Sequence, residues 1–177
     1  EDSTIGYATG YTYDDQGNLT REVYYRLDGS IGGGYEYTYD DQGRLLQKIY
    51  VSADGTKYIE EEYTYDDQGR LIREIEYYSD GTLYCTKEYT YDDQGKLLGK
   101  TELNEDASVN NTTEYTYDDQ GNLLQEITQD KDGALERSIK YFYDDQGRKT
   151  IKLSTKDRWM MAYSYDDHGN LILESDQ

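Results

Sequence analysis

The sequence contains no proline, one cysteine, one histidine and one tryptophan among its 177 residues. Because proline removes a backbone N–H donor, its absence favours uninterrupted ladders of hydrogen bonds between strands. Cys85 is alone, so it forms no intramolecular disulfide, and we expect a small apolar strand residue rather than a nucleophile. No apolar run is long enough to cross a bilayer as a helix, and no leader is present, so we expect that a leader or anchor has been cut off or left out of this chain.

Positive charge is also scarce. Eighteen Lys and Arg residues face 38 Asp and Glu residues, for a formal net charge of −20. Such a surface repels phosphate backbones and anionic lipids, so we expect neither nucleic acid as a partner nor membrane insertion. A chain this charged with 34% hydrophobic residues would suggest disorder, but its 23 tyrosines fit a pleated, half-buried surface and predict β-structure.

The most prominent feature present is a repeated heptapeptide, Tyr-Thr-Tyr-Asp-Asp-Gln-Gly. Six of the seven copies follow one another at 26 residues, and the last step is 22 residues. A fixed period of this length is typical of repeat architectures. We therefore predict a single β-repeat array over residues 1–177, with repeats that start at Tyr11, Tyr37, Tyr63, Tyr89, Tyr115, Tyr141 and Tyr163.

Two turn signals divide each repeat. The motif turn is the Asp-Asp-Gln-Gly end of the heptapeptide, for example residues 40–43, and the second turn is an Asp-Gly sequence such as residues 52–55. In both, glycine supplies the left-handed residue after a type I turn, which predicts a three-residue hairpin loop with a bulge. Between turns the apolar period is two. The fold class we predict is all-β: an antiparallel up-and-down meander of about fourteen strands without helices.

This loop type also predicts which residues face one another. We expect Tyr37 opposite Gln47 and Glu36 opposite Lys48. Open sheets rarely exceed about ten strands without curling, so we expect this sheet to coil or close with a buried tyrosine and leucine face inward. In the second repeat that face is predicted to comprise Tyr37, Tyr39, Leu45 and Ile49.

Three details leave alternatives open. The twelfth residue of successive repeats alternates in sign along a face that we expect to be the outer one, which indicates either a two-repeat unit or chance. Residues 159–161, Trp-Met-Met, form either an end plug or ordinary core. Residues 32–34, Gly-Gly-Gly, mark a bulge or the close approach of another surface. The alternating row reads Glu22, Lys48, Glu74, Lys100, Glu126, Lys152 and Glu174.

The string Tyr-x-Tyr-Asp-x-x-Gly-Arg-Leu, at residues 37–45 and 63–71, resembles the YD repeat of Rhs proteins, insecticidal toxin-complex shells, bacterial wall-associated proteins and teneurins. The resemblance covers essentially the whole chain and implies a β-strip that spirals around a hollow interior. In large family members this cocoon encloses a toxin domain or serves in adhesion. The chain lacks the proline-containing signature of the self-cleaving members, and seven repeats are too few to house a toxin domain, so neither property carries over.

The candidate chemistry is sparse. The paired aspartates of the motif turns form a row that suggests calcium sites, but aspartate at the first turn position also bonds its own backbone. Because neighbouring turns lie about 10 Å apart, too far to share a fully coordinated ion, turn chemistry is the preferred explanation, and we predict no cofactor, no metal site and no catalytic residue. His168 replaces a turn glutamine, and we do not expect it to act as a base.

We therefore expect a non-catalytic structural or interaction module of a secreted or surface-attached bacterial protein, acting in adhesion, scaffolding or assembly. Its expected partner is a protein or glycan surface. The alternative is a carbohydrate-binding module whose tyrosines stack on sugar faces, which requires them on a convex, exposed face. Its candidate residues are Tyr24, Tyr50, Tyr58, Tyr78 and Tyr84.

The N-terminal strand is a second candidate contact. Residues 4–13 carry no charge, so as an edge strand this segment would be open to pairing. We predict that this strand is an association site, within the chain or between copies, with Ile5, Tyr7 and Thr9 as the contact residues.

Overall fold

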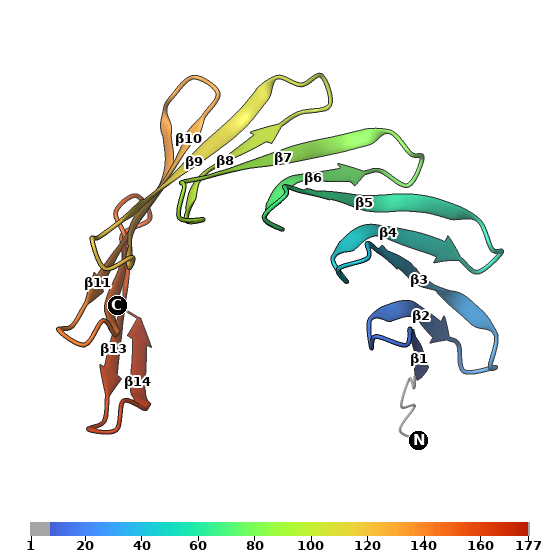
Figure 1. Cartoon of the computed structure of the whole chain (residues 1–177), viewed down its shortest axis with the longest axis horizontal. Coiled ribbons are helices and arrows are strands. Elements are labelled where there is room, and N and C mark those ends of the chain that lie inside the picture. The colour runs from blue at the N-terminus through green and yellow to red at the C-terminus, as the bar shows by residue number, and fades with distance from the viewer. Residues whose placement is uncertain (1–7, 177) are drawn as a thin grey trace. The chain divides into compact units, whose positions relative to one another are not determined.

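The structure is a computed structural model that describes residues 8–176. These residues form fourteen β-strands and no helix, and the order of the strands in the sheet is their order along the chain, from β1 to β14 (Figure 1). Neighbouring strands pair antiparallel, as in β1 with β2 and β3 with β4. The predicted all-β meander is confirmed. No helix able to span a membrane occurs in the described part of the chain.

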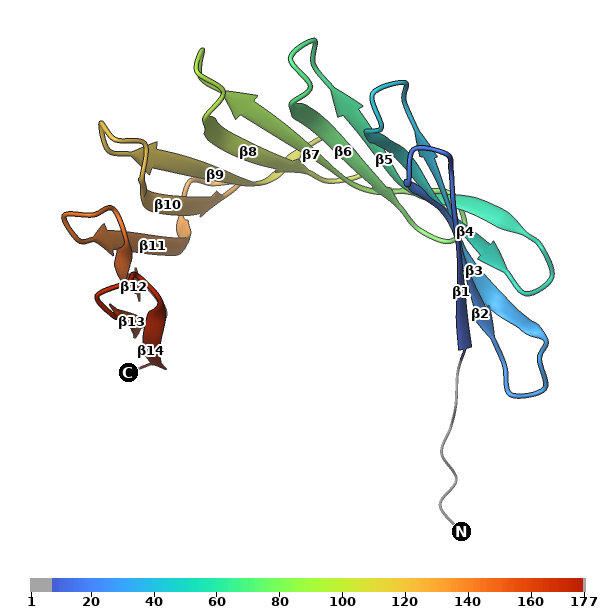
Figure 2. The ribbon, with the colours of Figure 1, turned by 60° about the horizontal axis from the view of Figure 1, so that its bottom comes forward.

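The chain divides into two compact units, Glu1–Thr86 and Lys87–Gln177, and β7 (Leu83–Tyr91) contributes to both. Within each unit, consecutive strands lie side by side and their loops alternate between the two ends (Figure 2). The first unit contains β1 (Ala8–Tyr13), β2 (Leu19–Tyr25), β3 (Ile31–Tyr39), β4 (Leu45–Ser52), β5 (Lys57–Tyr65) and β6 (Leu71–Tyr77). The second contains β8 (Leu97–Leu103), β9 (Val109–Tyr117), β10 (Leu123–Asp130), β11 (Leu135–Tyr143), β12 (Lys149–Ser154), β13 (Trp159–Tyr165) and β14 (Leu171–Asp176).

The turns have the predicted geometry. In the second repeat, Gly43 N donates to the Asp40 carbonyl at 3.0 Å, and Asp40 N donates to the Arg44 carbonyl at 3.0 Å. Gly43 has a φ of 77°, the left-handed conformation that glycine adopts without strain. The same two hydrogen bonds close the second turns of the first five repeats. In the turn at residues 104–107, Ala107 takes the position of the glycine, with a φ of 62°.

The first aspartate of the motif turn is fully engaged by the turn. Asp40 Oδ1 accepts hydrogen bonds from Gln42 N and Arg44 N, both at 2.9 Å, and its Oδ2 accepts one from Arg44 Nε at 2.6 Å. The backbone hydrogen bond from Arg44 is the largest cause that lowers the pKa of Asp40 below its ordinary value. In the first repeat Asn18 serves in place of the arginine, donating to Asp14 Oδ2 at 2.9 Å.

The predicted register is wrong beyond the turn. Tyr37 pairs with Lys48 rather than Gln47, and Glu36 pairs with Ile49 rather than Lys48. The cause is a second bulge: Tyr39 pairs with Leu45 and the next pair is Thr38 with Gln47, so Leu46 is an extra residue in β4. The motif hairpins that begin at β1, β5, β9, β11 and β13 carry a register shift at the equivalent place.

This bulge changes which side chains share a face. We call the side that carries the motif tyrosines the tyrosine face; in the second repeat it includes Tyr37, Tyr39, Leu45 and Lys48. Ile49 pairs with Glu36 and Ile59, so it lies on the opposite face, contrary to prediction. From Glu22 to Lys152 the row of alternating charges, predicted on the outer face, lies on the tyrosine face because cross-strand partners project to the same side.

The tyrosine face is half-buried rather than buried. Tyr37, Tyr39 and Leu45 all keep intermediate exposure, because the described residues supply one sheet with neither a helix nor a second sheet to cover it. The hydrophobic side chains that are buried are few: Val23 (8% exposed), Cys85 (7%) and Ile139 (0%). Cys85 is thus the small buried strand residue expected from the sequence.

Both explanations of the glycine run hold. A Cβ on Gly34 would lie 2.0 Å from the Glu22 carbonyl oxygen, and Gly33, with a φ of 137°, lies under the Tyr50 hydroxyl. The register between β2 and β3 also shifts at Tyr24 and Tyr25. At the other end of the chain, residues 159–161 are half-buried strand residues of β13, which supports the ordinary-core alternative over a plug.

Candidate functional site

The second motif tyrosine of a repeat holds the preceding repeat by one recurring contact. Tyr39 Oη donates to the Leu19 carbonyl oxygen at 2.8 Å. We call this contact the tyrosine staple. It recurs as Tyr65 to Leu45 (3.0 Å), Tyr117 to Leu97 (2.9 Å), Tyr143 to Leu123 (2.8 Å) and Tyr165 to Lys149 (2.8 Å).

The residue after the motif-turn glycine adds a second contact to the next repeat. The guanidinium of Arg44 lies 4.9 Å from the ring centre of Tyr65, and that of Arg148 lies 5.0 Å from Tyr165. Cations at this distance from an aromatic face are attracted by the ring quadrupole. The second motif tyrosine and the residue after the motif-turn glycine thus join one repeat to the next.

The alternating charges act on the tyrosine face in two ways. Tyr37 Oη donates to Glu22 at 3.3 Å, and Tyr141 Oη donates to Glu126 at 2.6 Å. The lysines lie over rings instead: Lys48 Nζ is 4.5 Å from the ring centre of Tyr35. Glu22 and Glu126 thus accept hydrogen bonds from tyrosine hydroxyls, and Lys48 and Lys152 lie over aromatic rings, whereas Lys100 pairs with Glu102.

Lys48 is the centre of a half-buried ionic cluster. Its Nζ lies 2.7 Å from the buried Oε2 of Glu60 and 3.4 Å from Glu61 Oε1. Burial alone would lower the pKa of Lys48, but the hydrogen bond to Glu60 and the charges of Glu61 and Glu60 raise it above its ordinary value. Glu61 also accepts a hydrogen bond from the Tyr63 hydroxyl, so this carboxylate has both Lys48 and a tyrosine as partners.

The first unit carries additional tyrosines on the same face. The rings form a chain: Tyr24 to Tyr35 at 6.2 Å, Tyr35 to Tyr50 at 5.6 Å and Tyr50 to Tyr58 at 5.1 Å between centroids. Offset and edge-to-face pairs at such distances stabilise aromatic clusters. Tyr24, Tyr50 and Tyr58, predicted as sugar-stacking residues, are thus half-buried among other rings of the tyrosine face.

The remaining two predicted tyrosines differ. Tyr78 and Tyr84 are each 50% exposed, and their rings meet edge to face at 5.0 Å. We call them the exposed pair. Of the five candidates, these two retain the exposed ring surface that stacking on a ligand requires.

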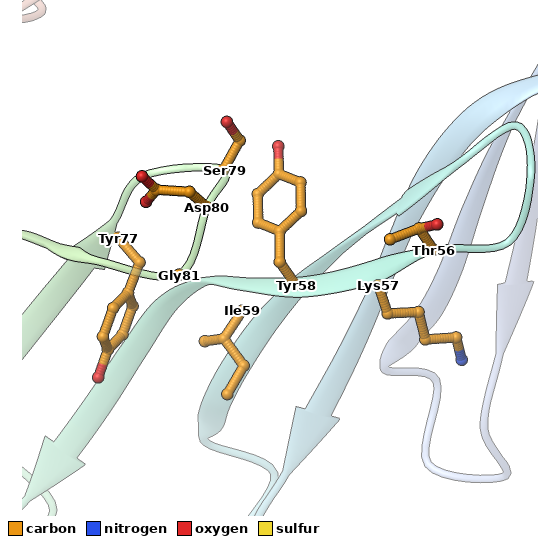
Figure 3. A pocket seen from close by; sticks show the side chains of 8 residues that line it. All are labelled: Thr56, Lys57, Tyr58, Ile59, Tyr77, Ser79, Asp80 and Gly81. Atoms are coloured by element: carbon orange, nitrogen blue, oxygen red, sulfur yellow. The ribbon is translucent and has the colours of Figure 1, made fainter.

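A pocket of about 430 Å³ lies near the exposed pair, where β5 begins and the β6–β7 turn passes (Figure 3). Tyr58 and Ser79 project to one side of the ribbon, whereas Ile59 and Tyr77 project to the other. Asp80 in this turn accepts from Thr82 Oγ1 at 2.6 Å, which is the largest cause lowering the pKa of its carboxyl. The pocket is lined by residues 56–59 and by Tyr77, Ser79, Asp80 and Gly81.

The predicted association strand is described only in part. Ile5 and Tyr7 lie outside the described residues, and Thr9 is an exposed residue of β1. Sequence reasoning missed Tyr11 and Tyr13, which are 55% and 58% exposed although their counterparts in later repeats are half-buried. Their signal was available, because both are motif tyrosines of a strand that pairs on one side only.

The aspartate row matches turn chemistry. A hollow of about 370 Å³ between the first two motif turns is lined by Asp14, Asp15, Asp40 and Asp41, among others. Over residues 8–176, no three His, Cys, Asp or Glu side chains are grouped to hold a metal ion. His168 occupies its turn position and donates its backbone N–H to Asp166.

Solved structures share this fold. The TcdB2-TccC3-Cdc42 structure matches with a TM-score of 0.63 at 19% identity, over 97% of this chain and 9% of that chain. The Tc holotoxin pore of Photorhabdus luminescens matches with 0.63 at 20% identity, over 96% and 9%. A porin-like protein from Bacteroides uniformis matches with 0.53 at 14% identity, over 99% and 89%. At these identities the likeness shows the fold alone.

The chain thus spans 9% of the length of the toxin chains that it matches, and its fold is the YD-repeat-like β-sheet to which the sequence resemblance points. None of the curated proteins matches the chain. A family model described as "Uncharacterised protein" matches residues 2–146. Because that match takes in more than half of the sequence, the chain belongs to this family.

Proposed function

We propose that the chain is a non-catalytic structural and interaction module of a secreted or surface-attached bacterial protein, of the YD-repeat kind. The observation that carries this proposal is the tyrosine staple, because this recurring contact joins each repeat to its neighbour. Repeats joined in this way present their half-buried tyrosine faces to a partner. The proposed roles are adhesion, scaffolding or assembly, and no reaction is assigned to the chain.

The fold supports the structural part of this proposal. The toxin-complex structures contain the same fold as a small share of a much longer chain, which fits a wall segment repeated along a larger assembly. The net charge of −20 favours partners that are neutral or positively charged over nucleic acid or anionic lipid.

Cells that display the chain on their outer surface provide a test. We expect them to bind surfaces coated with extracellular bacterial material several-fold more than cells without the chain. The variant Tyr78→Ser/Tyr84→Ser should lose this gain, whereas Leu27→Ser, at a 74% exposed residue of a second turn, should keep it. Equal binding with and without the chain would overturn the proposal.

A glycan is the second candidate partner. It is favoured by the exposed pair beside a pocket that offers the Tyr58 ring, the Ser79 hydroxyl and the Asp80 carboxylate, since an apolar ring with a few polar groups is what a sugar face requires. Periodate treatment of the coated surface destroys sugar diols, and protease treatment destroys proteins. Loss of binding after periodate alone supports the glycan, and loss after protease alone rejects it.

A further inference from the structure

Each repeat has a donor side and an acceptor side. The donor is the second motif tyrosine, and the acceptor is the carbonyl of the residue that opens the strand after the preceding motif turn. This polarity is the same in both units, since Tyr39 reaches back to Leu19 and Tyr117 reaches back to Leu97. Two ends of such an array are therefore different and complementary.

The donor end is β1. Its Tyr13 occupies the staple position, yet the ring is 58% exposed, whereas Tyr39 and Tyr117 are half-buried against the preceding repeat. The described residues contain no counterpart of that preceding repeat. β1 pairs with β2 on one side, is the end strand on the other, and carries no charged residue. Edges of this kind accept another strand readily.

The acceptor end is β14. Leu171 opens this strand, in the position from which Leu19 and Leu97 offer their carbonyls to a tyrosine of the next repeat. Leu171 is 51% exposed, whereas Leu19 and Leu97 are half-buried. Among the described residues, none covers Leu171 in the way that the next repeat covers Leu19 and Leu97.

We propose that β1 of one copy pairs with β14 of a second copy, antiparallel and in the register of β2 with β3, with Tyr13 donating to the Leu171 carbonyl. Within the chain, Glu22 pairs with Tyr35 and Val23 pairs with Gly34. Shifted by whole repeats, this register sets position 174 opposite Thr9 of the second copy. The occupant is a second copy because the contact continues the interface that already joins repeats.

The negative charge of both copies opposes this contact and makes it depend on the salt concentration. Each copy carries a net charge of −20, so the copies repel one another at low salt. Association should therefore tighten as the salt concentration rises, the opposite of a contact made by ion pairs.

Sedimentation velocity of the full chain over a range of concentrations and salt tests the proposal. We expect reversible, salt-promoted association, weakened about 2–10-fold by Tyr13→Phe through loss of one hydrogen bond. Tyr39→Phe removes an inner staple and should leave association unchanged. A wild type that stays monomeric at high concentration and high salt, or association weakened as much by Tyr39→Phe as by Tyr13→Phe, would overturn the proposal.

A charge-reversal pair tests the register. Thr9→Glu sets two acids opposite each other and should weaken association about 2–5-fold, and Thr9→Glu combined with Glu174→Lys should restore it. Failure of the second change to restore association would overturn the pairing of β1 with β14. These sheet edges are separate from the exposed pair, so either result leaves the proposed binding role to its own test.

Discussion

The two units are built from the same repeat but differ in the aromatic residues that they add to it. Both have the motif turns, the bulge after each turn and the tyrosine staple. The added tyrosines at positions 24, 50, 58, 78 and 84 are confined to the first unit. At the positions that correspond to these tyrosines, whole repeats of 26 residues later, the second unit has Glu102, Asn104, Asn110, Thr128, Asp130 and Glu136.

The difference teaches which tyrosines the fold requires. The second unit forms the same hairpins without the added rings, so the motif tyrosines are sufficient for the repeat. At the position of half-buried Tyr35 the second unit has Lys87, Thr113 and Ile139, and the last two are buried. The fold therefore does not require tyrosine at this position, and we infer that the added tyrosines of the first unit serve its surface.

High pH should separate the stabilities of the two units most strongly. Burial, followed by the charge of Glu22, raises the pKa of Tyr37 to about 12, and burial also raises the pKa of Tyr39, Tyr65 and Tyr117. Such groups stabilise the fold below about pH 10, the ordinary tyrosine value, and this contribution is lost as the pH rises through the raised pKa. The mounting negative charge acts in the same direction.

We therefore expect the chain to unfold between about pH 10 and pH 12, with the tyrosine-richer first unit unfolding at the lower pH. Circular dichroism follows both units, whereas fluorescence of the single tryptophan, Trp159, reports the second. A chain that keeps its strands after all of its tyrosines have ionised would contradict this prediction.

Gly34→Ala should damage the first unit selectively. The new Cβ would meet the Glu22 carbonyl at 2.0 Å, and because that atom belongs to the backbone the strands must move apart. We expect a loss of about 1–3 kcal/mol in denaturant unfolding of the first unit, with the Trp159 signal of the second unit unchanged. Gly32→Ala is the control, since its nearest atom lies 3.4 Å away. Equal losses in the two variants would show that the close approach at Gly34 is not strained.

Loss of a staple hydroxyl should affect both units alike. Tyr39→Phe and Tyr117→Phe each remove one hydrogen bond to a carbonyl at 2.8 and 2.9 Å. We expect each variant to lose about 0.5–1.5 kcal/mol of unfolding free energy. A clear difference between the two would mean that the added tyrosines of the first unit reinforce its staples.

Transfer of the exposed pair should change stability least. Asn104 and Asn110 stand one repeat after Tyr78 and Tyr84, so Asn104→Tyr/Asn110→Tyr would build a second pair. We expect stability to stay within about 0.5 kcal/mol, because these are surface positions. Added to Tyr78→Ser/Tyr84→Ser, the change should restore surface binding. No restoration would mean that binding also needs the neighbouring pocket.

The strands, the turns and the pairing of Tyr39 with Leu45 could be predicted from the sequence, because turn chemistry is local. It failed from Leu46 onward, since a period of two does not register an inserted residue, and one insertion moved Lys48 to the tyrosine face and Ile49 away from it. The apolar pair Leu45-Leu46, repeated after several motif turns, was the available signal. The exposure of Tyr78 relative to Tyr58 was beyond reach, because it depends on which rings pack across the strands.

The staple also governs how such an array can change in length. Tyr165 reaches the Lys149 carbonyl at 2.8 Å across 16 residues, whereas Tyr143 reaches Leu123 across 20. The repeat that begins at Tyr141 is four residues shorter than the others, and the difference lies where β12 turns into β13, at the end away from the motif turns. The staple is nevertheless present. Insertions and deletions should therefore accumulate at that end, and whole repeats should be gained or lost as units, while the motif end admits neither.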